Sequence, residues 1–301
     1  GTMRRCEQCH QAESSHAWLP YTRRHFQAMN CEACHIPEVF APARQQTDWT
    51  VLQPDGTPAV AHRGADGDPR DPATLLHGFR PVLLPREELD GSRKLTPHNL
   101  IATWYWVGGD PPRPVPRDVL RRAFLDGESF RPEVRTLLDA NHDGTLDAAE
   151  LRLDTPAKAD AIAARLAALG VKNPRIRGEV QPYSLHHGVA THQWAVRACS
   201  ECHEGQSRTT APIELASYVP GGVLPTLVGD ANVQWNGRMD REASGRLIYR
   251  PATARVPLYV LGRDRWKTGD LIGMLALTGA LLGVGVHGGL RLVAARRRGA
   301  A

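Results

Sequence analysis

Three copies of one five-residue motif constrain this chain more than any other feature of its sequence. They read CEQCH, CEACH and CSECH, and together they use all six cysteines. With 13 histidines in 301 residues, a histidine follows all three C-x-x-C pairs by chance with a probability of roughly 10⁻⁴. Two thiols at this spacing can add to the vinyl groups of one haem, and the adjacent imidazole reaches its iron from the same side. The motif residues are Cys6, Cys9, His10, Cys31, Cys34, His35, Cys199, Cys202 and His203.

A C-x-x-C pair alone has other readings. It also fits a zinc half-site, a redox dithiol or a structural disulfide. A four-cysteine zinc site would combine two pairs and leave the third pair over. None of these alternatives explains why a histidine always follows. The motifs therefore predict three covalently attached c-type haems.

Each haem iron needs a sixth ligand. The chain has only four methionines, so a second histidine is the economical choice, and it predicts low-potential haems because methionine ligation raises the potential. His25 and His192 lie six and seven residues before a motif. That is too close to reach the neighbouring haem, so each is predicted to ligate another haem of a packed pair. His16 and His187 are the next candidates, and a surface or hydrogen-bonded histidine is the alternative for each.

Composition favours an irregular backbone. Aromatic residues make up 6% of the chain, which also has 23 prolines and 28 glycines, so haems would supply part of the apolar bulk of the core. Residues 36–95 carry several turn clusters and are predicted to be loops over the haem region. Helices are predicted from about Asp118 and over 157–170, and short strands or a hairpin over 232–251. The expected fold class is mainly α with much irregular loop, wrapped around haems.

The stretch DANHDGTLDAAE matches the calcium loop of an EF-hand. Residues 130–139 have helical spacing leading into the loop, and 149–153 are predicted to continue as helix after it. Calcium sensors commonly pair such loops, so one loop favours a structural calcium ion; a solvated acidic turn is the alternative. The predicted ligands are Asp139, Asn141, Asp143, the carbonyl of Thr145, Asp147 and Glu150, with Gly144 at the sharp turn.

The C-terminal region predicts a membrane anchor. Leu271–Leu290 contains no charged side chain apart from His287 when it is protonated, and 20 apolar residues match the bilayer core. The arginines that follow predict a cytoplasmic C-terminus. The haem region would then lie in the periplasm, with the chain crossing the cytoplasmic membrane once and Trp266 at the outer interface. A buried soluble helix is the alternative.

This anchor also suggests a partner. Gly279/Gly283 and Gly285/Gly289 would let another helix approach closely, as expected of a membrane cytochrome b or other quinone-interacting subunit. His287 is either a ligand to a b-type haem or quinone contact shared with that partner, or a neutral histidine near the interface. Much of the net charge of +5 lies in the tail, so we predict no nucleic-acid role.

The motifs divide the chain into four predicted regions. Two haem sites occupy 1–118, a helical calcium-loop insertion 119–170, the third haem site with short strands 171–262, and the anchor with its basic tail 263–301. The first motif begins at residue 6 without a secretory signal before it. A removed leader and a fragment of a longer chain both account for this, and we favour the fragment.

Two segments, THQWAVRACSECH and HNLIATWYWVGG, resemble parts of multihaem cytochromes of the octahaem tetrathionate reductase and hydroxylamine oxidoreductase superfamily. The first is similar to their last haem site with a histidine shortly upstream, and the second to an aromatic segment ahead of it. This chain has three haem motifs, no C-x-x-C-K motif and no identified cross-linking tyrosine. The resemblance therefore implies a shared scaffold and haem packing rather than their catalytic activity.

Two functions follow from these features. The first is an electron-transfer subunit between a quinone-linked membrane cytochrome b and periplasmic cytochromes or reductases, because two axial ligands close each iron to substrate. The alternative is a reductase of a small nitrogen or sulfur oxyanion with one open haem, in which Arg197 and Arg208 near the third motif hold the anion. Those arginines could equally pair with haem propionates. A calcium-regulated sensor would rest on a single loop.

Overall fold

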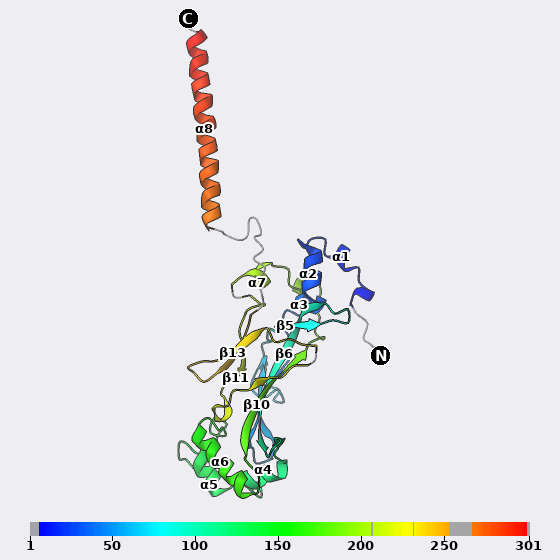
Figure 1. Cartoon of the computed structure of the whole chain (residues 1–301), viewed down its shortest axis with the longest axis vertical. Helices are drawn as coiled ribbons and strands as arrows, with labels where there is room; N and C mark the ends of the chain where they lie inside the picture. The colour runs from blue at the N-terminus through cyan, green and yellow to red at the C-terminus, as the bar shows by residue number, and fades with distance from the viewer. Residues whose placement is uncertain (1–5, 206, 231, 253–266, 300–301) are drawn as a thin grey trace. The chain divides into compact units, whose positions relative to one another are not determined.

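A computed structural model describes residues 6–205, 207–230, 232–252 and 267–299 (Figure 1). The side chain of His192 lies outside the part of the chain that it describes. The chain forms two compact units, Gly1–Thr253 and Ala254–Ala301. The first unit contains the sheets and the haem motifs, and the second contains the helix α8 (Lys267–Gly299).

Among the described residues, a mixed sheet of seven strands runs through the first unit (Figure 1). Its strands are β1 (Ala43–Leu52), β2 (Pro58–Arg63), β5 (Val82–Glu87), β6 (Arg93–Gly108), β7 (Arg113–Pro114), β10 (Arg175–Ser184) and β12 (Thr226–Leu227). The order is β12-β10-β6-β1-β2, and β5 and β7 pair with opposite ends of β6. β1 is parallel to β6 and β10 is parallel to β12, whereas the other pairs are antiparallel.

The sequence of β6 explains why the sheet forms around it. No glycine or proline interrupts residues 100–107, and every second side chain from 100 to 106 is buried, which is the period of a strand. The indole N–H of Trp104 donates to the carbonyl of Val223 at 2.8 Å, and that of Trp106 to the carbonyl of Thr50 at 3.0 Å. Both tryptophans are therefore buried without losing a hydrogen bond.

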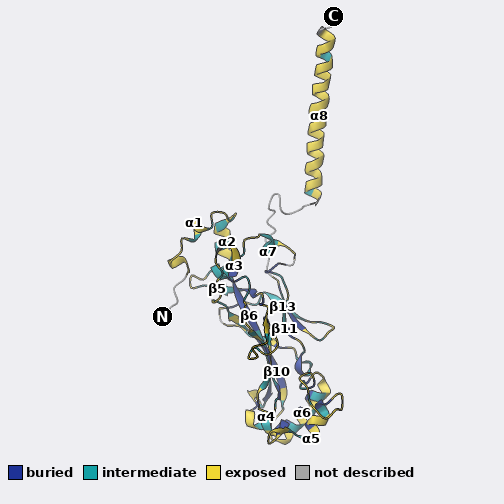
Figure 2. Ribbon diagram, turned by 180° about the vertical axis from the view of Figure 1, so that it is seen from behind, coloured by how far each residue is buried: buried dark blue, intermediate teal, exposed yellow. Residues whose placement is uncertain are grey.

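A group of helices packs on the same core, at the opposite end of β6 from the haem motifs (Figures 1 and 2). Each buries an apolar stripe, with Phe124, Leu138 and Ile162 fully buried in it. α4 ends where Leu125 becomes extended and begins β8, and α6 ends just before Gly170, at φ 91°. The elements are α4 (Arg117–Phe124), α5 (Pro132–Leu138) and α6 (Pro156–Ala168), with the short hairpin β8 (Leu125–Asp126) and β9 (Ser129–Phe130).

The remaining elements of the first unit are small. A three-stranded sheet has the order β11-β14-β13, and its β13–β14 hairpin lies where the sequence predicts one. After β2, a second small sheet is formed by two short antiparallel strands, β3 and β4. The strands are β11 (Ile213–Ala216), β13 (Gly237–Arg241), β14 (Leu247–Pro251), β3 (Ala65–Asp66) and β4 (Leu75–Leu76), and the turn η3 (Pro220–Gly222) follows β11.

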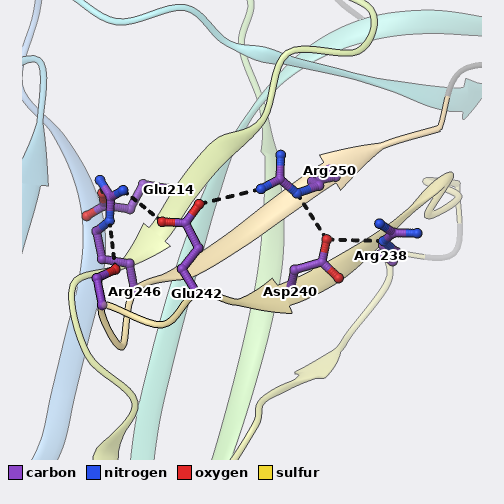
Figure 3. A network of polar contacts seen from close by, with 7 residues as sticks. Glu214, Arg238, Asp240, Glu242, Arg246 and Arg250 are labelled. Carbon is purple, nitrogen blue, oxygen red and sulfur yellow. Dashed lines mark hydrogen bonds and ion pairs between the residues drawn. The ribbon is translucent and has the colours of Figure 1, made fainter.

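A row of ion pairs covers the three-stranded sheet (Figure 3). Arg246 lies 3.5 Å from Glu214 and 2.7 Å from Glu242. Arg250 in turn lies 3.5 Å from Glu242 and 3.0 Å from Asp240. Exposed pairs of this kind contribute little one by one, but their sharing of partners fixes the register of the β13–β14 hairpin on β11.

The expected fold class, mainly α with irregular loops, is wrong. The structure is mixed α/β, with 28% strand and 32% helix, and residues 36–95 form strands rather than loops. The turn clusters were read correctly as turns, but they connect strands: residues 53–57 join β1 to β2, and 88–92 join β5 to β6. Polar side chains such as Gln46, Asp48 and Thr50 are buried in β1 and hid its strand pattern.

The helix predictions fared better. α4, α5 and α6 form close to their expected positions. The predicted helix over 149–153 is wrong, because residues 148–150 form a turn and helix resumes only at Pro156. Pro156 begins α6, and Thr155 caps it by accepting the N–H of Lys158 at 3.3 Å.

The helix α8 is long and apolar enough to cross a membrane. An 18-residue window within its segment Thr268–Arg298 has a mean hydropathy of 1.8, and the apolar side chains of the helix are exposed (Figure 2). Three arginines close its last turn. His287 lies on this helix, whereas Trp266 lies outside the described residues.

Candidate functional site

Each motif folds into a short helical turn. The first occupies η1 (Cys6–Gln8), the second α3 (Cys31–His35) and the third α7 (Ser200–His203). In the first and third motifs, the N–H of the histidine donates to the carbonyl of the first cysteine at 2.9 Å. A helical turn places positions i, i+3 and i+4 on one face. The two thiols and the imidazole of each motif therefore share a face, as attachment to one haem requires.

The three motifs gather at one end of the large sheet (Figure 1). The second motif is tied to β6, since Asn30 donates its backbone N–H to Leu95 at 3.0 Å and its side chain to Thr96 at 3.0 Å. The chain before the third motif pairs with the second: Val196 donates to the carbonyl of Cys34 at 2.9 Å. Motifs far apart in the sequence thus become neighbours.

The six cysteines are free thiols in this structure, and their surroundings argue against redox chemistry by the thiols themselves. Burial, followed by the charge of Glu7, raises the pKa of Cys31 to about 12. Burial, followed by the neighbouring Cys34, raises the pKa of Cys202 to about 11. A reactive thiol has a lowered pKa. The raised pKa values of Cys31 and Cys202 therefore differ from those of reactive thiols.

Two histidines lie opposite motif histidines. The rings of His16 and His35 have centroids 6.0 Å apart at an interplanar angle of 83°, and those of His25 and His203 are 6.0 Å apart at 86°. His16 and His25 come from α1 (Ala12–Ser15) with its C-cap and from α2 (Thr22–Ala28). Each pair therefore joins a motif to the N-terminal helices.

The hydrogen bonds of three of these rings fix their tautomer. Nδ1 of His16 lies 2.8 Å from the carbonyl of Ala12, and Nδ1 of His35 lies 2.9 Å from that of Ala190. His25 makes the same contact to its preceding turn, at 3.3 Å. A carbonyl can only accept, so Nδ1 carries the proton and the lone pair of Nε2 is free. Metal-bound histidines are commonly oriented in this way.

The spacing of the pairs fits an iron between them. A metal lies about 2 Å from each coordinating imidazole nitrogen. Two imidazoles on one iron therefore have ring centroids about 6.2 Å apart, given ring bonds of about 1.3 Å. The observed 6.0 Å agrees with this value. The centroid spacing at the second and third motifs thus fits two histidine ligands on one iron, and a direct edge-to-face contact between two rings has the same spacing.

Three other histidines in the described part of the chain make polar contacts through both ring nitrogens. His98 is fully buried, with Nδ1 at 2.8 Å from the carbonyl of Thr96 and Nε2 at 3.0 Å from the hydroxyl of Ser184. Burial, above all, lowers the pKa of His98 to about 4. His77 and His186 are likewise bonded through both nitrogens. These three are structural rather than metal ligands.

The structure does not place a partner for the first motif. Within the described side chains, no second histidine ring stands opposite His10. His187 is exposed on the chain after β10 and faces none of the motif histidines among the described residues. His192 begins the turn η2 (His192–Trp194), but its side chain lies outside what the structure describes.

Two arginines near the third motif have defined roles. The guanidinium of Arg197 stacks on the ring of Trp18 at 4.7 Å. Arg208 is 5% exposed and donates to the carbonyls of Ala33 and Ile36. The guanidinium of Arg208 is therefore engaged with backbone carbonyls, whereas Arg197 is exposed. The sequence marked Arg208 as a basic neighbour, but only the fold reveals that it binds the second motif.

The acidic loop between α5 and α6 has one unpaired oxygen. Asp139 is 8% exposed, and its Oδ2 accepts the N–H of Gly144 at 3.0 Å. Its Oδ1 is buried and has no hydrogen-bond partner among the described residues. A buried carboxylate oxygen without a partner is costly, so this atom fits a bound cation.

The other predicted calcium ligands bond within the loop. Glu150 is 7% exposed, and its carboxylate accepts the N–H groups of Ala140 and Asn141 at 2.9 and 3.1 Å. Asp143 and Asp147 accept N–H groups two residues further on at 2.7 Å, while Thr145 donates its N–H and its hydroxyl to Asp143. In the ranges that the structure describes, no three His, Cys, Asp or Glu side chains gather as metal ligands. The loop is folded, but its carboxylates do not converge.

Comparison with known proteins adds little. No protein-family model matches this chain, and no curated protein matches it. One solved structure that superposes in part is the octaheme cytochrome c from Shewanella oneidensis, with 12% sequence identity and a TM-score of 0.38. The match covers 68% of this chain and 49% of that chain, so it spans about half of that cytochrome. A likeness this low carries no argument, and the site must be judged on its own geometry.

Proposed function

We propose that this chain is a membrane-anchored c-type cytochrome with three haems, serving as an electron-transfer subunit. The observation that carries the proposal is the pairing of His35 with His16 and of His203 with His25, each at 6.0 Å. At each motif a bound haem would supply a one-electron redox centre. The chain supplies the thiols, the axial imidazoles and the carbonyls that orient them.

The ligand assignments follow from the pairs. Cys31 and Cys34 would hold the second haem between His35 and His16. Cys199 and Cys202 would hold the third haem between His203 and His25.

Cys6 and Cys9 would hold the first haem, with His10 as its motif ligand. His192 and His187 are the proposed candidates for its sixth position. His192 would reach across to this haem from the chain just before the third motif.

Closed coordination favours conduction over catalysis. With two imidazoles on one iron no position is open for a substrate, so the second and third sites suit electron passage. The direct bonding of the chain before the third motif to Cys34 and His35 keeps these two sites adjacent, as transfer between them requires.

We propose that α8 anchors the chain in the cytoplasmic membrane with its C-terminus in the cytoplasm. Its terminal arginines agree with the positive-inside rule, and the haem unit would then lie in the periplasm. Its glycine pairs would receive a helix of a membrane cytochrome b or other quinone-interacting subunit, and periplasmic cytochromes or reductases would exchange electrons with the haem unit. His287→Ala tests the shared b-type haem: the proposal predicts that the c-type haems stay and that the b-type absorbance of the purified complex is lost.

The function is tested on the full chain matured in a host that attaches c-type haem. We expect three haems per chain and a ferric spectrum that is low-spin at the paired sites and binds neither cyanide nor nitrite. A wild-type protein that contains high-spin haem and reduces nitrite or tetrathionate would contradict a role in electron transfer alone and would support the reductase. A chain without covalent haem would refute both.

For the loop 139–150 we propose a structural calcium ion, supported by the unpaired Oδ1 of Asp139. The ion would draw Glu150 away from its backbone partners and order the exit segment. That segment is docked on the core, because Arg152 stacks on Tyr218 at 4.7 Å and Leu153 accepts the N–H of Gly221 at 2.6 Å. Calcium would therefore hold the helical insertion to the core rather than signal.

This site is tested by calorimetric titration of calcium and by melting with and without a chelator. We expect calcium to raise the melting temperature of the wild-type chain and of Asp160→Asn, an exposed acid outside the loop. Asp139→Asn should lose both the binding heat and the rise. Absence of binding by the wild-type chain, or equal binding by both variants, would rule the site out.

A further inference from the structure

Arg208 is held between the second and third motifs. Its terminal nitrogens donate to the carbonyl of Ala33 at 2.5 Å and to that of Ile36 at 3.0 Å, at the C-terminal end of α3. Its backbone N–H donates to the carbonyl of Glu201, inside the third motif, at 2.8 Å. Thr209 reinforces this link by donating its hydroxyl to the carbonyl of Cys202 at 3.0 Å. One residue thus joins two haem-attachment sites.

The charge of Arg208 is buried and weakly compensated. The residue is 5% exposed, and its Nε has no partner among the described residues. Burial is the largest influence on its pKa and lowers it, whereas the nearby Cys202 and Cys34 raise it. A guanidinium remains protonated in proteins. The charged groups that act on it are Glu201 and Arg80, and within the described ranges no carboxylate lies at ion-pair distance from it.

The position of this cation has an electrostatic consequence. Reducing a haem adds one negative charge, so a fixed positive charge nearby favours the reduced form. The effect is larger where burial lowers the local dielectric constant. Arg208 donates to the carbonyl of Ala33, next to Cys34, and its neighbour Thr209 donates to the carbonyl of Cys202. Cys34 and Cys202 are the proposed covalent links to two different haems. One charge therefore acts on both.

We infer that Arg208 is a positioning residue that raises the reduction potentials of the second and third haems together. This inference rests on the proposed function, since it requires haem at both motifs. The hydrogen bonds to Ala33 and Ile36 keep the guanidinium in place between the two sites. The charged neighbours of Cys6 in the first motif are Glu32 and Glu7 rather than this cation.

The test compares variants that separate charge from packing, in the haem-loaded full chain. Arg208→Met removes the charge but keeps a long side chain, and Arg208→Lys keeps the charge but loses the two-pronged donation. Arg80→Met removes a neighbouring exposed charge and serves as the control. The haem content is counted first, and the three midpoint potentials are then measured by optical titration at controlled potential.

We expect R208M to lower two of the three potentials, with R208K close to the wild type and R80M nearly unchanged. Equal shifts in R208M and R208K, equal shifts of all three haems, or no shift would overturn the inference. If R208M loses haem, R208Q takes its place and the same outcomes apply. A wild-type chain without three haems would instead refute the proposed function, which the haem count detects separately.

Discussion

Replacing His25 by alanine tests the crossed ligation of the third haem. The ring of His25 lies 6.0 Å from that of His203, a distance that fits one iron between them, and His25 belongs to α2 rather than to the third motif. Alanine is a better helix former than histidine, so α2 should persist. The variant removes one axial ligand and leaves every covalent attachment in place.

The size of the effect follows from the number of sites. One of three irons loses its sixth ligand, so about one third of the ferric haem should become high-spin. His16→Ala should convert a different third, and the double variant about two thirds, since the two pairs share no residue. Each variant should retain three haems, and added imidazole should restore the low-spin spectrum.

The assay is electron paramagnetic resonance of the ferric protein together with its visible spectrum. His62→Ala, a substitution on β2, is the matched control and should remain low-spin. A fully low-spin His25→Ala protein with three haems would refute the ligand assignment. A similar high-spin rise in His62→Ala would show that the change reports general loosening rather than ligation.

Two predictions concern the fold. Trp104→Phe should lower the free energy of unfolding by about 2 kcal/mol or more, because it opens space in the core and leaves the carbonyl of Val223 without its hydrogen bond. Tyr183→Phe, which changes an exposed side chain, should change the free energy of unfolding by no more than about 0.5 kcal/mol. Denaturant titration of the full chain in detergent measures both values. The pKa of His98, lowered to about 4 chiefly by burial and then by Arg86 and His186 against the opposing Asp230, means that the unfolded chain binds a proton there before the folded chain does. Stability should therefore fall as the pH drops from about 6.5 toward 4, by up to about 3 kcal/mol, and His98→Gln should flatten this slope in unfolding curves recorded across that range.

The apolar helix and the helical turns of the C-x-x-C-H motifs depend on local signals in the sequence. A C-x-x-C-H motif needs only one helical turn, and α8 needs only an uninterrupted apolar run. The helices of the insertion likewise begin and end at local signals, such as Pro156 and Gly170. Each of these features is decided by neighbours in the chain.

The large sheet could not be read in the same way. β6 pairs with its sequence neighbours β5 and β7, but also with β1 and β10, which are distant in the sequence. The run of apolar, β-branched and aromatic residues from 100 to 107 favours a strand and is a signal that could have revealed it. In β1 that signal is masked, because Asp48 is buried with Thr50 and Tyr218 as hydrogen-bond partners. A polar side chain satisfied by a distant partner looks like a loop residue until the fold is known.

The candidate axial ligands show the same division. Sequence alone identified His25 and His16 as candidates, but it did not say which motif each would face. That choice depends on how α1 and α2 pack beside the second and third motifs. The bonds from Nδ1 to backbone carbonyls are equally invisible in the sequence, because any residue can supply the carbonyl.

Because His25 and His203 come from opposite ends of the first unit's sequence, an iron held by both would act as a cross-link. Such a link closes a long loop of chain and lowers the entropy of the unfolded state. The N-terminal helices, which bury few apolar side chains of their own, would then owe their order to a cofactor attached near the other end. Assembly would then follow a fixed order. His25 is synthesised early, but its position would be fixed only after the third haem has been attached to Cys199 and Cys202.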